Sequence, residues 1–275
     1  ELGTAALFHG TFDARLPTCT FGDEPITLDI GMPEDENAKR FASLPDSLAD
    51  SLRYHPRVCR LVLRHGNIIL HNIEGDIRPP EPEELPGLTM MAYGTSITHG
   101  AAASAFHLTY VAQTAWRLGA DLINYGVGGA CRAEAAFADY LAGLKNWDFA
   151  TLALSVNMIG AGFTIEDFTS RTRYLIGKIA VENPDKPVAC ISIYPYFGDF
   201  ANLQPSATAG PEEFRSALES VVAGLDLPNV HFIPGPEILT DISGLTQDII
   251  HPGDLAMINM GENLAKRLAP LIGDL

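Results

Sequence analysis

The sequence has 275 residues, of which 47% are apolar and 19% charged, a composition typical of a folded protein with a sizeable core. The 34 acidic residues outnumber the 18 basic ones, and the resulting formal net charge of −16 repels nucleic acid phosphates and anionic membrane surfaces. The sequence contains neither a basic cluster nor an apolar run of about 20 residues, so we expect no nucleic acid partner and no membrane partner. It leaves the oligomeric state open.

The four cysteines are scattered through the chain, and no two have the Cys-x-x-Cys spacing of a zinc or redox site. We therefore expect no metal, and free thiols at Cys19, Cys59, Cys131 and Cys190. The sequence begins at Glu1 rather than at a methionine. This start is compatible with a cytoplasmic protein and with a processed, secreted one, and we favour the cytoplasmic alternative.

Short runs of β-forming residues, separated by turn residues, fill the first part of the chain. Residues 26–31 alternate apolar and polar side chains as a half-buried strand does, and residues 57–75 are predicted to form a hairpin. A helix is predicted here only over 45–52. The pattern predicts a small β-sandwich domain over 1–77, and the proline-rich, acidic stretch that follows predicts a linker over 78–87.

From Leu88 onward, apolar strands alternate with amphipathic helices. The predicted strands cover 88–94, 121–127, 151–156, 186–194 and 230–235. The predicted helices cover 109–119, 133–144, 164–181, 210–225 and 254–272. Near-continuous apolar strands in this alternation predict a parallel five-stranded sheet with helices on both faces. We therefore expect a three-layer, flavodoxin-like α/β domain over 88–275, with ligands bound at the carboxyl ends of the strands.

Two details of the helices are also predicted. Thr164 and Asp167 have the spacing of a capping box at the start of the helix over 164–181. Trp116 lies on the apolar face of the helix over 109–119, so we expect it in the core.

Ser96 follows the first strand of this domain and precedes a predicted short helix. Backbone N–H groups at the start of a helix are unpaired and carry partial positive charge, so they can stabilise an oxyanion beside a nucleophilic hydroxyl. The alternative is that Ser96 or Thr98 is an ordinary helix N-cap. A nucleophilic serine also needs a base.

Asp248 and His251 lie three residues apart, between the last strand and the last helix. On one turn, the carboxylate can accept a hydrogen bond from one imidazole nitrogen and leave the other nitrogen free to take a serine proton. Their place in the predicted fold brings them toward the end of the first strand.

Oxyanion donors are predicted at the ends of the next two strands. Gly129 lies in a glycine-rich stretch that leaves backbone N–H groups accessible, and Asn157 brings an amide. A plain glycine turn and a turn-forming asparagine are the alternatives. A dinucleotide site is disfavoured because the third spaced glycine of its motif is missing.

Taken together, these blocks resemble the SGNH or GDSL-type hydrolases over residues 88–275. The resemblance rests on four stretches in the family's order: Tyr93–Gly100, Asn124–Ala130, Ser155–Met158 and Asp248–Pro252. The sequence departs from the family pattern at Thr95, where the first block has an aspartate, and at Ser155 and Met158, where the third block has glycine and aspartate. The variant blocks are similar to a subgroup with an N-terminal β-sandwich.

The resemblance implies a serine esterase that forms an acyl-enzyme. Ser96 would attack an acyl carbonyl, and His251, held by Asp248, would remove the serine proton. The Ser96 N–H, the Gly129 N–H and the Asn157 amide would surround the oxyanion, and water would release the acyl group. No metal or organic cofactor is implied, and small acyl esters or acetylated carbohydrates are the expected substrates.

The sequence leaves two other functional classes open. An acyltransferase would move the acyl group from a thioester or ester to an alcohol of a natural product or sugar, and it would share the acyl-enzyme. A non-catalytic binding module is disfavoured by the complete set of catalytic residue types.

Four further residues are candidates for substrate contact. His99 lies three residues after Ser96, and Arg132 follows the Gly129 turn. Tyr194 and Tyr196 begin a long segment after the fourth strand, which either walls the substrate pocket or is a proline-rich connector. A surface histidine and a structural ion pair are the alternatives for His99 and Arg132.

Overall fold

The computed structural model describes residues 3–9, 12–13, 19–21, 24–27, 39–40, 43–64, 69–154, 156–201 and 205–273. The chain forms two compact units, Glu1–Gly87 and Leu88–Leu275. The boundary between them lies at the end of the segment predicted as a linker.

The first unit contains an antiparallel sheet built around one central strand. Strand β1 (Gly3–His9) pairs with β2 (Phe12–Asp13), β3 (Cys19–Phe21) and β4 (Cys59–Arg64). A β-sandwich consists of two sheets, whereas the described residues of this unit form a single sheet. The β-sandwich therefore stays a prediction.

Local patterns in the first unit were partly misleading. The predicted helix is present as α2 (Asp46–Ala49). The predicted hairpin is wrong, because only its first arm is a strand: β4 pairs with β1, whereas residues 69–75 form no strand. The strand predicted over 26–31 is absent at residues 26–27, and its remainder lies outside the described residues.

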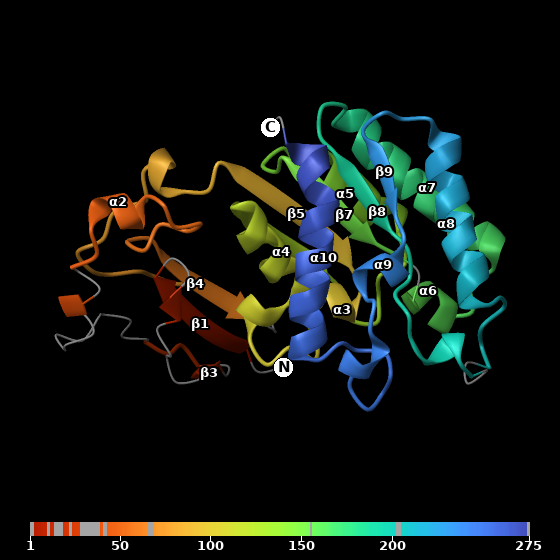
Figure 1. Cartoon of the computed structure of the whole chain (residues 1–275), viewed down its shortest axis with the longest axis horizontal. Coiled ribbons are helices and arrows are strands. Elements are labelled where there is room, and N and C mark those ends of the chain that lie inside the picture. Colours follow the sequence, from red (N-terminus) through yellow and green to blue (C-terminus); the bar gives the residue numbers. More distant parts are fainter. Residues whose placement is uncertain are drawn as a thin grey trace. The chain divides into compact units, whose positions relative to one another are not determined.

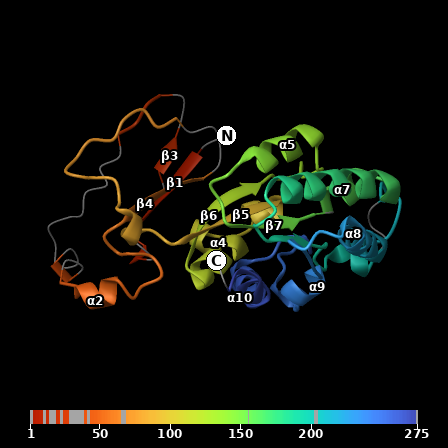
Figure 2. The same ribbon diagram turned by 90° about the horizontal axis from the view of Figure 1, so that it is seen from above.

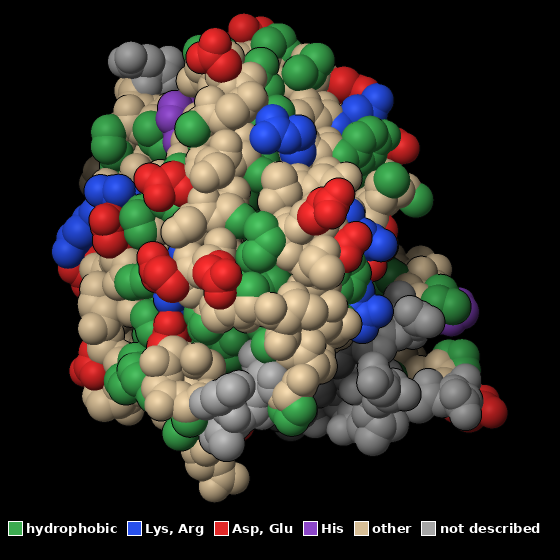
Figure 3. Space-filling view, turned by 90° about the vertical axis from the view of Figure 1, so that its right-hand side faces the viewer, with side chains coloured by type: hydrophobic (Ala, Val, Ile, Leu, Met, Phe, Trp, Pro, Cys, Tyr) green, Lys and Arg blue, Asp and Glu red, His purple; other side chains and the backbone are tan. Residues whose placement is uncertain are grey.

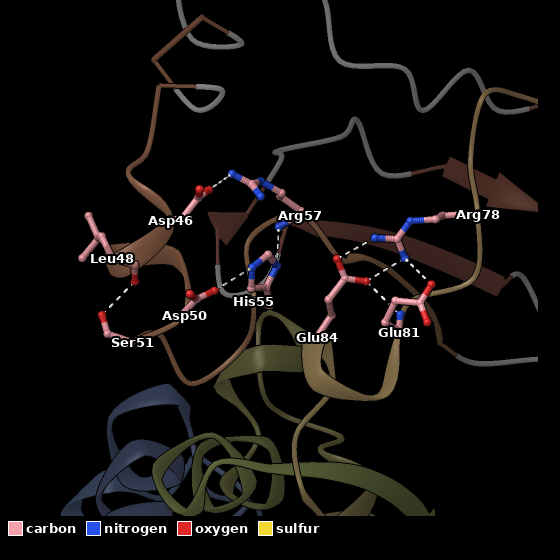
Figure 4. A network of polar contacts seen from close by, with 9 residues as sticks. All are labelled: Asp46, Leu48, Asp50, Ser51, His55, Arg57, Arg78, Glu81 and Glu84. Carbon is pink, nitrogen blue, oxygen red and sulfur yellow. Dashed lines mark hydrogen bonds and ion pairs between the residues drawn. The ribbon is translucent and has the colours of Figure 1, made fainter.

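Charged side chains fasten the surface turns of the first unit (Figure 4). Arg78 donates two hydrogen bonds of 2.8 Å to the two carboxylate oxygens of Glu84, across the 3₁₀ turn η1 (Pro82–Glu84). The Glu81 N–H donates to the same carboxylate over 2.8 Å. Arg57 also pairs with Asp46 on α2. These groups are exposed or partly exposed, so each pair contributes little alone and mainly fixes the course of the chain before the second unit.

The second unit contains the predicted parallel sheet of five strands. The strands are β5 (Leu88–Gly94), β6 (Ala120–Gly126), β7 (Phe149–Ala153), β8 (Val188–Ile191) and β9 (Val230–Ile233). Their order is β6-β5-β7-β8-β9, and every pairing is parallel. The first strand thus has its successor β6 on one side and β7 on the other. The order reverses at the carboxyl end of β5, which is where open α/β sheets bind their ligands.

Helices cover both faces of this sheet (Figures 1 and 2). One face packs against α4 (Tyr110–Leu118) and α10 (Asp254–Ile272). The other packs against α5 (Ala135–Gly143), α7 (Ile165–Glu182) and α8 (Pro211–Leu225). Each layer has its own buried cluster, so the three-layer α/β prediction is confirmed.

Details of the helices confirm one local prediction and correct another. The capping box of α7 is present: Thr164 Oγ1 accepts from the Asp167 N–H over 3.1 Å, and the Asp167 carboxylate accepts from the Thr164 N–H over 3.4 Å. Trp116, in contrast, is 39% exposed, because the buried face of α4 is formed by residues that precede it, Tyr110, Val111, Ala112, Thr114 and Ala115.

Acidic and basic side chains are mixed on the surface. On the face drawn in Figure 3, acidic and basic side chains are interspersed and the hydrophobic ones are scattered among them. Among the described helices, none has both the length and the hydropathy that a membrane crossing requires.

Candidate active site

Ser96 begins a short helix, α3 (Ser96–His99), that lies directly on the ends of β5 and β6. Glycine makes this close approach possible. A Cβ atom at Gly94 would lie 2.2 Å from Thr98 Oγ1, and one at Gly126 would lie 2.2 Å from the His99 backbone nitrogen. The Asn124 side-chain amide donates to the Thr98 carbonyl over 2.9 Å. The strand ends therefore hold α3, and with it Ser96, in a fixed position.

Thr95, and not Ser96, caps this helix. Its hydroxyl accepts a hydrogen bond of 3.2 Å from the Ile97 N–H, and the residue is 3% exposed. The Thr98 hydroxyl instead lies 2.7 Å from the Tyr110 hydroxyl. The alternative reading of Ser96 or Thr98 as the N-cap is therefore wrong, and the Ser96 hydroxyl is available for another partner.

That partner is His251, 155 residues further along the chain. Ser96 Oγ lies 2.7 Å from His251 Nε2, and His251 Nδ1 lies 2.6 Å from Asp248 Oδ2. The Nδ1–H group donates to the carboxylate, which leaves Nε2 as an acceptor for the serine O–H. The structure thus brings the three residues together in the order that the sequence predicts.

The second oxygen of Asp248 is held just as firmly. Oδ1 accepts hydrogen bonds of 2.9 Å from Thr246 Oγ1, the Ile250 N–H and the His251 N–H. Partial burial by itself would raise the pKa of Asp248, but the hydrogen bonds from His251, Ile250 and Thr246 outweigh it and hold this pKa well below its usual range. The carboxylate is therefore charged whenever the imidazole needs a counterion.

The turn between these two residues has an unusual backbone conformation. Ile249 has a φ of +54°, a left-handed conformation that is rare for a β-branched side chain. Such a conformation costs on the order of 1–3 kcal/mol and persists only where surrounding contacts fix it. Here the Ile249 N–H donates to the Thr246 carbonyl, and the Ile249 carbonyl accepts from the Phe197 N–H over 2.9 Å.

The glycine turn after β6 passes close to Ser96. A Cβ atom at Gly128 would lie 3.9 Å from the Ser96 Cβ, and the next residue, Gly129, has a φ of +72°. Asn157 belongs to the short helix α6 (Val156–Gly160), because β7 ends three residues earlier than predicted. Its Oδ1 accepts from the Cys131 N–H over 3.1 Å, which orients the amide and leaves its Nδ2 group as a donor. The loop and α6 are thereby tied together beside Ser96.

The remaining candidates occupy different environments. His99 is half-buried at the end of α3, and Arg132 is exposed just after the Gly129 turn. Tyr194 and Tyr196 are buried, at 5% and 2% exposure. Both line a small apolar pocket whose walls also include the immediate neighbours of Ser96, Asn157 and His251; its lining residues are Thr95, Ile97, Ala153, Leu154, Val156, Ser192, Ile193, Tyr194, Tyr196 and Ile250.

Sequence reasoning missed three contacts that shape this site. Asn124 holds α3, the Cys131 N–H orients Asn157, and Thr246 binds the Asp248 carboxylate. Only Thr246 had a readable signal, because a threonine two residues from an aspartate is a common partner in side-chain-stabilised turns. Over the described ranges, no group of three or more His, Cys, Asp or Glu side chains could hold a metal ion.

Comparison with protein families decides the assignment of the chain. Residues 89–269 match the model of the GDSL-like Lipase/Acylhydrolase family. The chain belongs to this family. The match covers nearly all of the second unit, including Ser96, Gly129, Asn157, Asp248 and His251. A search of curated protein sequences found no significant match.

Solved structures of similar fold include proteins with different described activities. The salicylyl-acyltransferase SsfX3 from a tetracycline biosynthetic pathway is 21% identical, with a TM-score of 0.60, over 68% of this chain and 55% of that one. A putative GDSL-like lipase from Bacteroides ovatus is 24% identical, with a TM-score of 0.59, over 68% and 54% of the two chains. This chain thus matches only about half the length of either protein.

A third structure matches over nearly the whole chain. It is a carbohydrate esterase family 2 enzyme with a carbohydrate binding domain from Corynascus thermopiles (Myceliophthora fergusii). It is 18% identical, with a TM-score of 0.65, over 99% of this chain and 88% of that chain. At these identities the likeness concerns the fold, and the GDSL-like family is compatible with ester hydrolysis and with acyl transfer.

Proposed function

We propose that this protein is a GDSL-type serine esterase that forms an acyl-enzyme on Ser96. The observation that carries the proposal is the chain of two hydrogen bonds from Ser96 through His251 to Asp248, with lengths of 2.7 and 2.6 Å. Both lengths are within the range over which a base can take a proton from a nucleophile.

The first step is attack on an acyl carbonyl. As the Ser96 oxygen bonds to the carbonyl carbon, its proton passes to His251 Nε2, and the charged Asp248 carboxylate stabilises the imidazolium that forms. The same proton then goes to the leaving alcohol. In the second step, water attacks the acyl-enzyme with His251 again acting as base, and the carboxylic acid leaves.

Oxyanion stabilisation comes from groups around the Ser96 hydroxyl. The Ser96 N–H, the Gly129 N–H and the Asn157 Nδ2 group are the proposed donors. The support for Asn157 is that the Cys131 N–H fixes its carbonyl oxygen, and the support for Gly129 is that its turn passes beside Ser96. Loss of one such donor typically reduces kcat by roughly a hundred- to a thousandfold.

The proposed acyl group is short. The apolar pocket beside Ser96 has about the room that one water molecule occupies, and the buried side chains of Tyr194 and Tyr196 are among its walls. An acetyl methyl group fits such a space, whereas a longer chain requires these buried side chains to move. Small acyl esters and acetylated carbohydrates are therefore the proposed substrates, with Arg132 and His99 as proposed contacts to the alcohol part.

Acyl transfer is the second candidate. The described activity of SsfX3, whose structure has a similar fold, favours keeping it, because transfer and hydrolysis share every step up to the acyl-enzyme. The two outcomes separate when an alcohol acceptor is added to a thioester or ester donor, since transfer yields a new ester and hydrolysis yields only the acid.

The N-terminal unit is proposed to be the accessory β-sandwich of the family subgroup, joined by a linker over 78–87. Its antiparallel sheet and the near-complete coverage by the carbohydrate esterase with a carbohydrate binding domain support this proposal.

The proposed function is tested by Ser96→Ala. Wild-type protein is expected to hydrolyse 4-nitrophenyl acetate faster than the butyrate and octanoate esters, and Ser96→Ala is expected to lose turnover by several orders of magnitude while staying folded. Ser220→Ala, which removes a serine hydroxyl on the exposed side of α8, is the matched control. Turnover by Ser96→Ala at the wild-type rate would exclude the proposed nucleophile.

A further inference from the structure

The turn that carries Asp248 and His251 is tied to the loop that follows β8. The Phe197 N–H donates to the Ile249 carbonyl over 2.9 Å, and Ile249 is the residue with the left-handed backbone. Along the chain, the Ile249 carbonyl lies between Asp248 and His251, which the proposed mechanism needs hydrogen-bonded to each other. The loop after β8 therefore bears directly on how Asp248 and His251 face each other.

This loop is itself anchored by a shielded ion pair. Arg215 of α8 is 9% exposed, and its NH1 and NH2 groups donate to the two carboxylate oxygens of Asp199 over 2.7 and 3.0 Å. Its Nε donates to the Ile193 carbonyl over 3.1 Å. The Arg215 guanidinium thus binds the loop at two places, near its start at Ile193 and at the end of the 3₁₀ turn η3 (Phe197–Asp199).

Asp199 passes this constraint back along the loop. Its Oδ2 also accepts from the Tyr196 N–H over 3.0 Å, and its own N–H donates to the Tyr196 carbonyl over 3.0 Å. These bonds fix the peptide group between Tyr196 and Phe197, which contains the N–H that reaches Ile249. A continuous set of polar contacts therefore runs from Arg215 through Asp199 and Phe197 to Ile249.

We propose that Arg215 and Asp199 are positioning residues for the Ser96–His251–Asp248 site, acting through the Phe197–Ile249 hydrogen bond. This inference rests on the proposed function. A left-handed isoleucine persists only while its surroundings fix it. When Asp199 no longer fixes the loop, the Phe197 N–H loses its place, Ile249 relaxes, and Asp248 and His251 turn away from each other and from Ser96.

Arg215 contacts two carboxylates but forms a two-pronged pair with only one of them. The side chain of Arg215 also reaches Glu212 over 3.3 Å, yet its planar fork points its two parallel hydrogen bonds at Asp199. A shielded ion pair is weak evidence for stability, because apolar residues of similar size often replace it without loss. Replacing both charged residues by apolar ones is therefore expected to leave the protein folded, so that an effect on the reactivity of Ser96 can be distinguished from an effect on folding.

The test is the double variant Asp199→Leu/Arg215→Met, which removes both charges together and keeps apolar volume. The probe is phenylmethanesulfonyl fluoride, whose covalent reaction with Ser96 reports activation of the nucleophile without knowledge of the natural substrate. We expect the folded double variant to react on the order of ten- to a hundredfold more slowly than wild type, because small displacements of catalytic groups have effects of this size. We also expect the downfield proton resonance of the His251 Nδ1–H group to weaken or disappear.

Arg215→Lys provides a second variant that leaves no unpaired carboxylate. Lysine keeps the positive charge but not the two-pronged geometry, so it is expected to react at an intermediate rate. The matched control is Glu237→Leu/Arg267→Met, which removes an exposed ion pair of 3.0 Å between α9 (Gly235–Ile238) and α10 and should react like wild type.

Three results are possible, and each decides the question. Slow reaction of the folded double variant, with a normal control, supports positioning. Reaction at the wild-type rate with an unchanged proton resonance shows that the pair is only structural, while labelling of wild type at Ser96 leaves the proposed function intact. Failure of wild-type protein to react at Ser96 overturns both proposals.

Discussion

The buried hydroxyl of Thr95 explains the departure from the family's first block. An aspartate at this position can accept the N–H of the second residue that follows, and Thr95 accepts the same kind of bond from the Ile97 N–H. Thr95 is 3% exposed, and a buried carboxylate without a cationic partner is costly. The neutral hydroxyl therefore keeps the capping function and adds no charge next to Ser96.

Thr95→Ala is expected to lower the free energy of unfolding of the second unit by about 1 kcal/mol, the usual effect of losing an N-cap side chain. Thr95→Ser, which keeps the acceptor, is the matched control and should stay within a few tenths of wild type. Urea denaturation followed by tryptophan fluorescence measures this change. Equal stability of the alanine and serine variants would show that the cap has no energetic role.

At the residue scale, the sequence predicts the proposed reactive groups better than the contacts that hold them. Ser96, Asp248 and His251 follow from chemical type and spacing, and their side chains meet as expected. The Cys131 N–H that orients Asn157 is a backbone group, so no side-chain pattern encodes it. The exposure of Trp116 was missed for a different reason: the apolar periodicity assigned the indole to the buried face of α4, whereas the structure leaves it 39% exposed.

At the scale of elements, the turn from Thr246 to His251 shows how local geometry serves the site. The Asp248 carboxylate accepts hydrogen bonds from two backbone N–H groups of its own turn, and Ile249 in the same turn has the left-handed conformation. The spacing of Asp248 and His251 could be read from the sequence. The sign of φ at Ile249 could not, because isoleucine is among the residues that least favour it.

Ile249→Asn is expected to raise the free energy of unfolding by about 1 kcal/mol, because asparagine adopts positive φ more readily than a β-branched residue does. Little burial is lost, since Ile249 is already 44% exposed. Activity toward 4-nitrophenyl acetate should be retained. Ile242→Asn, at a similarly exposed isoleucine (41%) without positive φ, is the control and should not be stabilised. Equal stability changes in the two variants would contradict strain at Ile249.

At the scale of the whole molecule, the structure is easier to predict from the sequence where the residues in contact are close together in the sequence. The second unit alternates strand and helix, so each element's neighbour in sequence is close in space, and its sheet was predicted to within a few residues at most ends. The first unit pairs Ala5 with Leu63, far apart in sequence, and a local pattern at residues 57–75 therefore suggested the wrong partner.

The two units also differ in how their stability can be observed. The two tryptophans of the sequence, Trp116 and Trp147, both belong to the second unit, so tryptophan fluorescence does not report on the first. Hydrogen exchange does. The amides of Glu84 and Leu85, which donate to the carbonyls of Glu81 and Pro82, report on the turn closed by Arg78 and Glu84 (Figure 4).

This turn is expected to lose stability in acid. The hydrogen bond from Arg78 and that from the Glu81 N–H lower the pKa of Glu84 to about 2, below its value of about 4.3 in an unfolded chain. A lowered folded-state pKa stabilises the structure above the unfolded value, and this contribution is lost as the pH falls toward about 2. Protection factors at the Glu84 and Leu85 amides, corrected for intrinsic exchange, should therefore fall between about pH 5 and pH 2.

Glu84→Gln should remove most of this pH dependence. Glu83→Gln, at a neighbouring carboxylate outside the ion pair, should retain it, and equal profiles for the two variants would rule out the Arg78–Glu84 pair as its source.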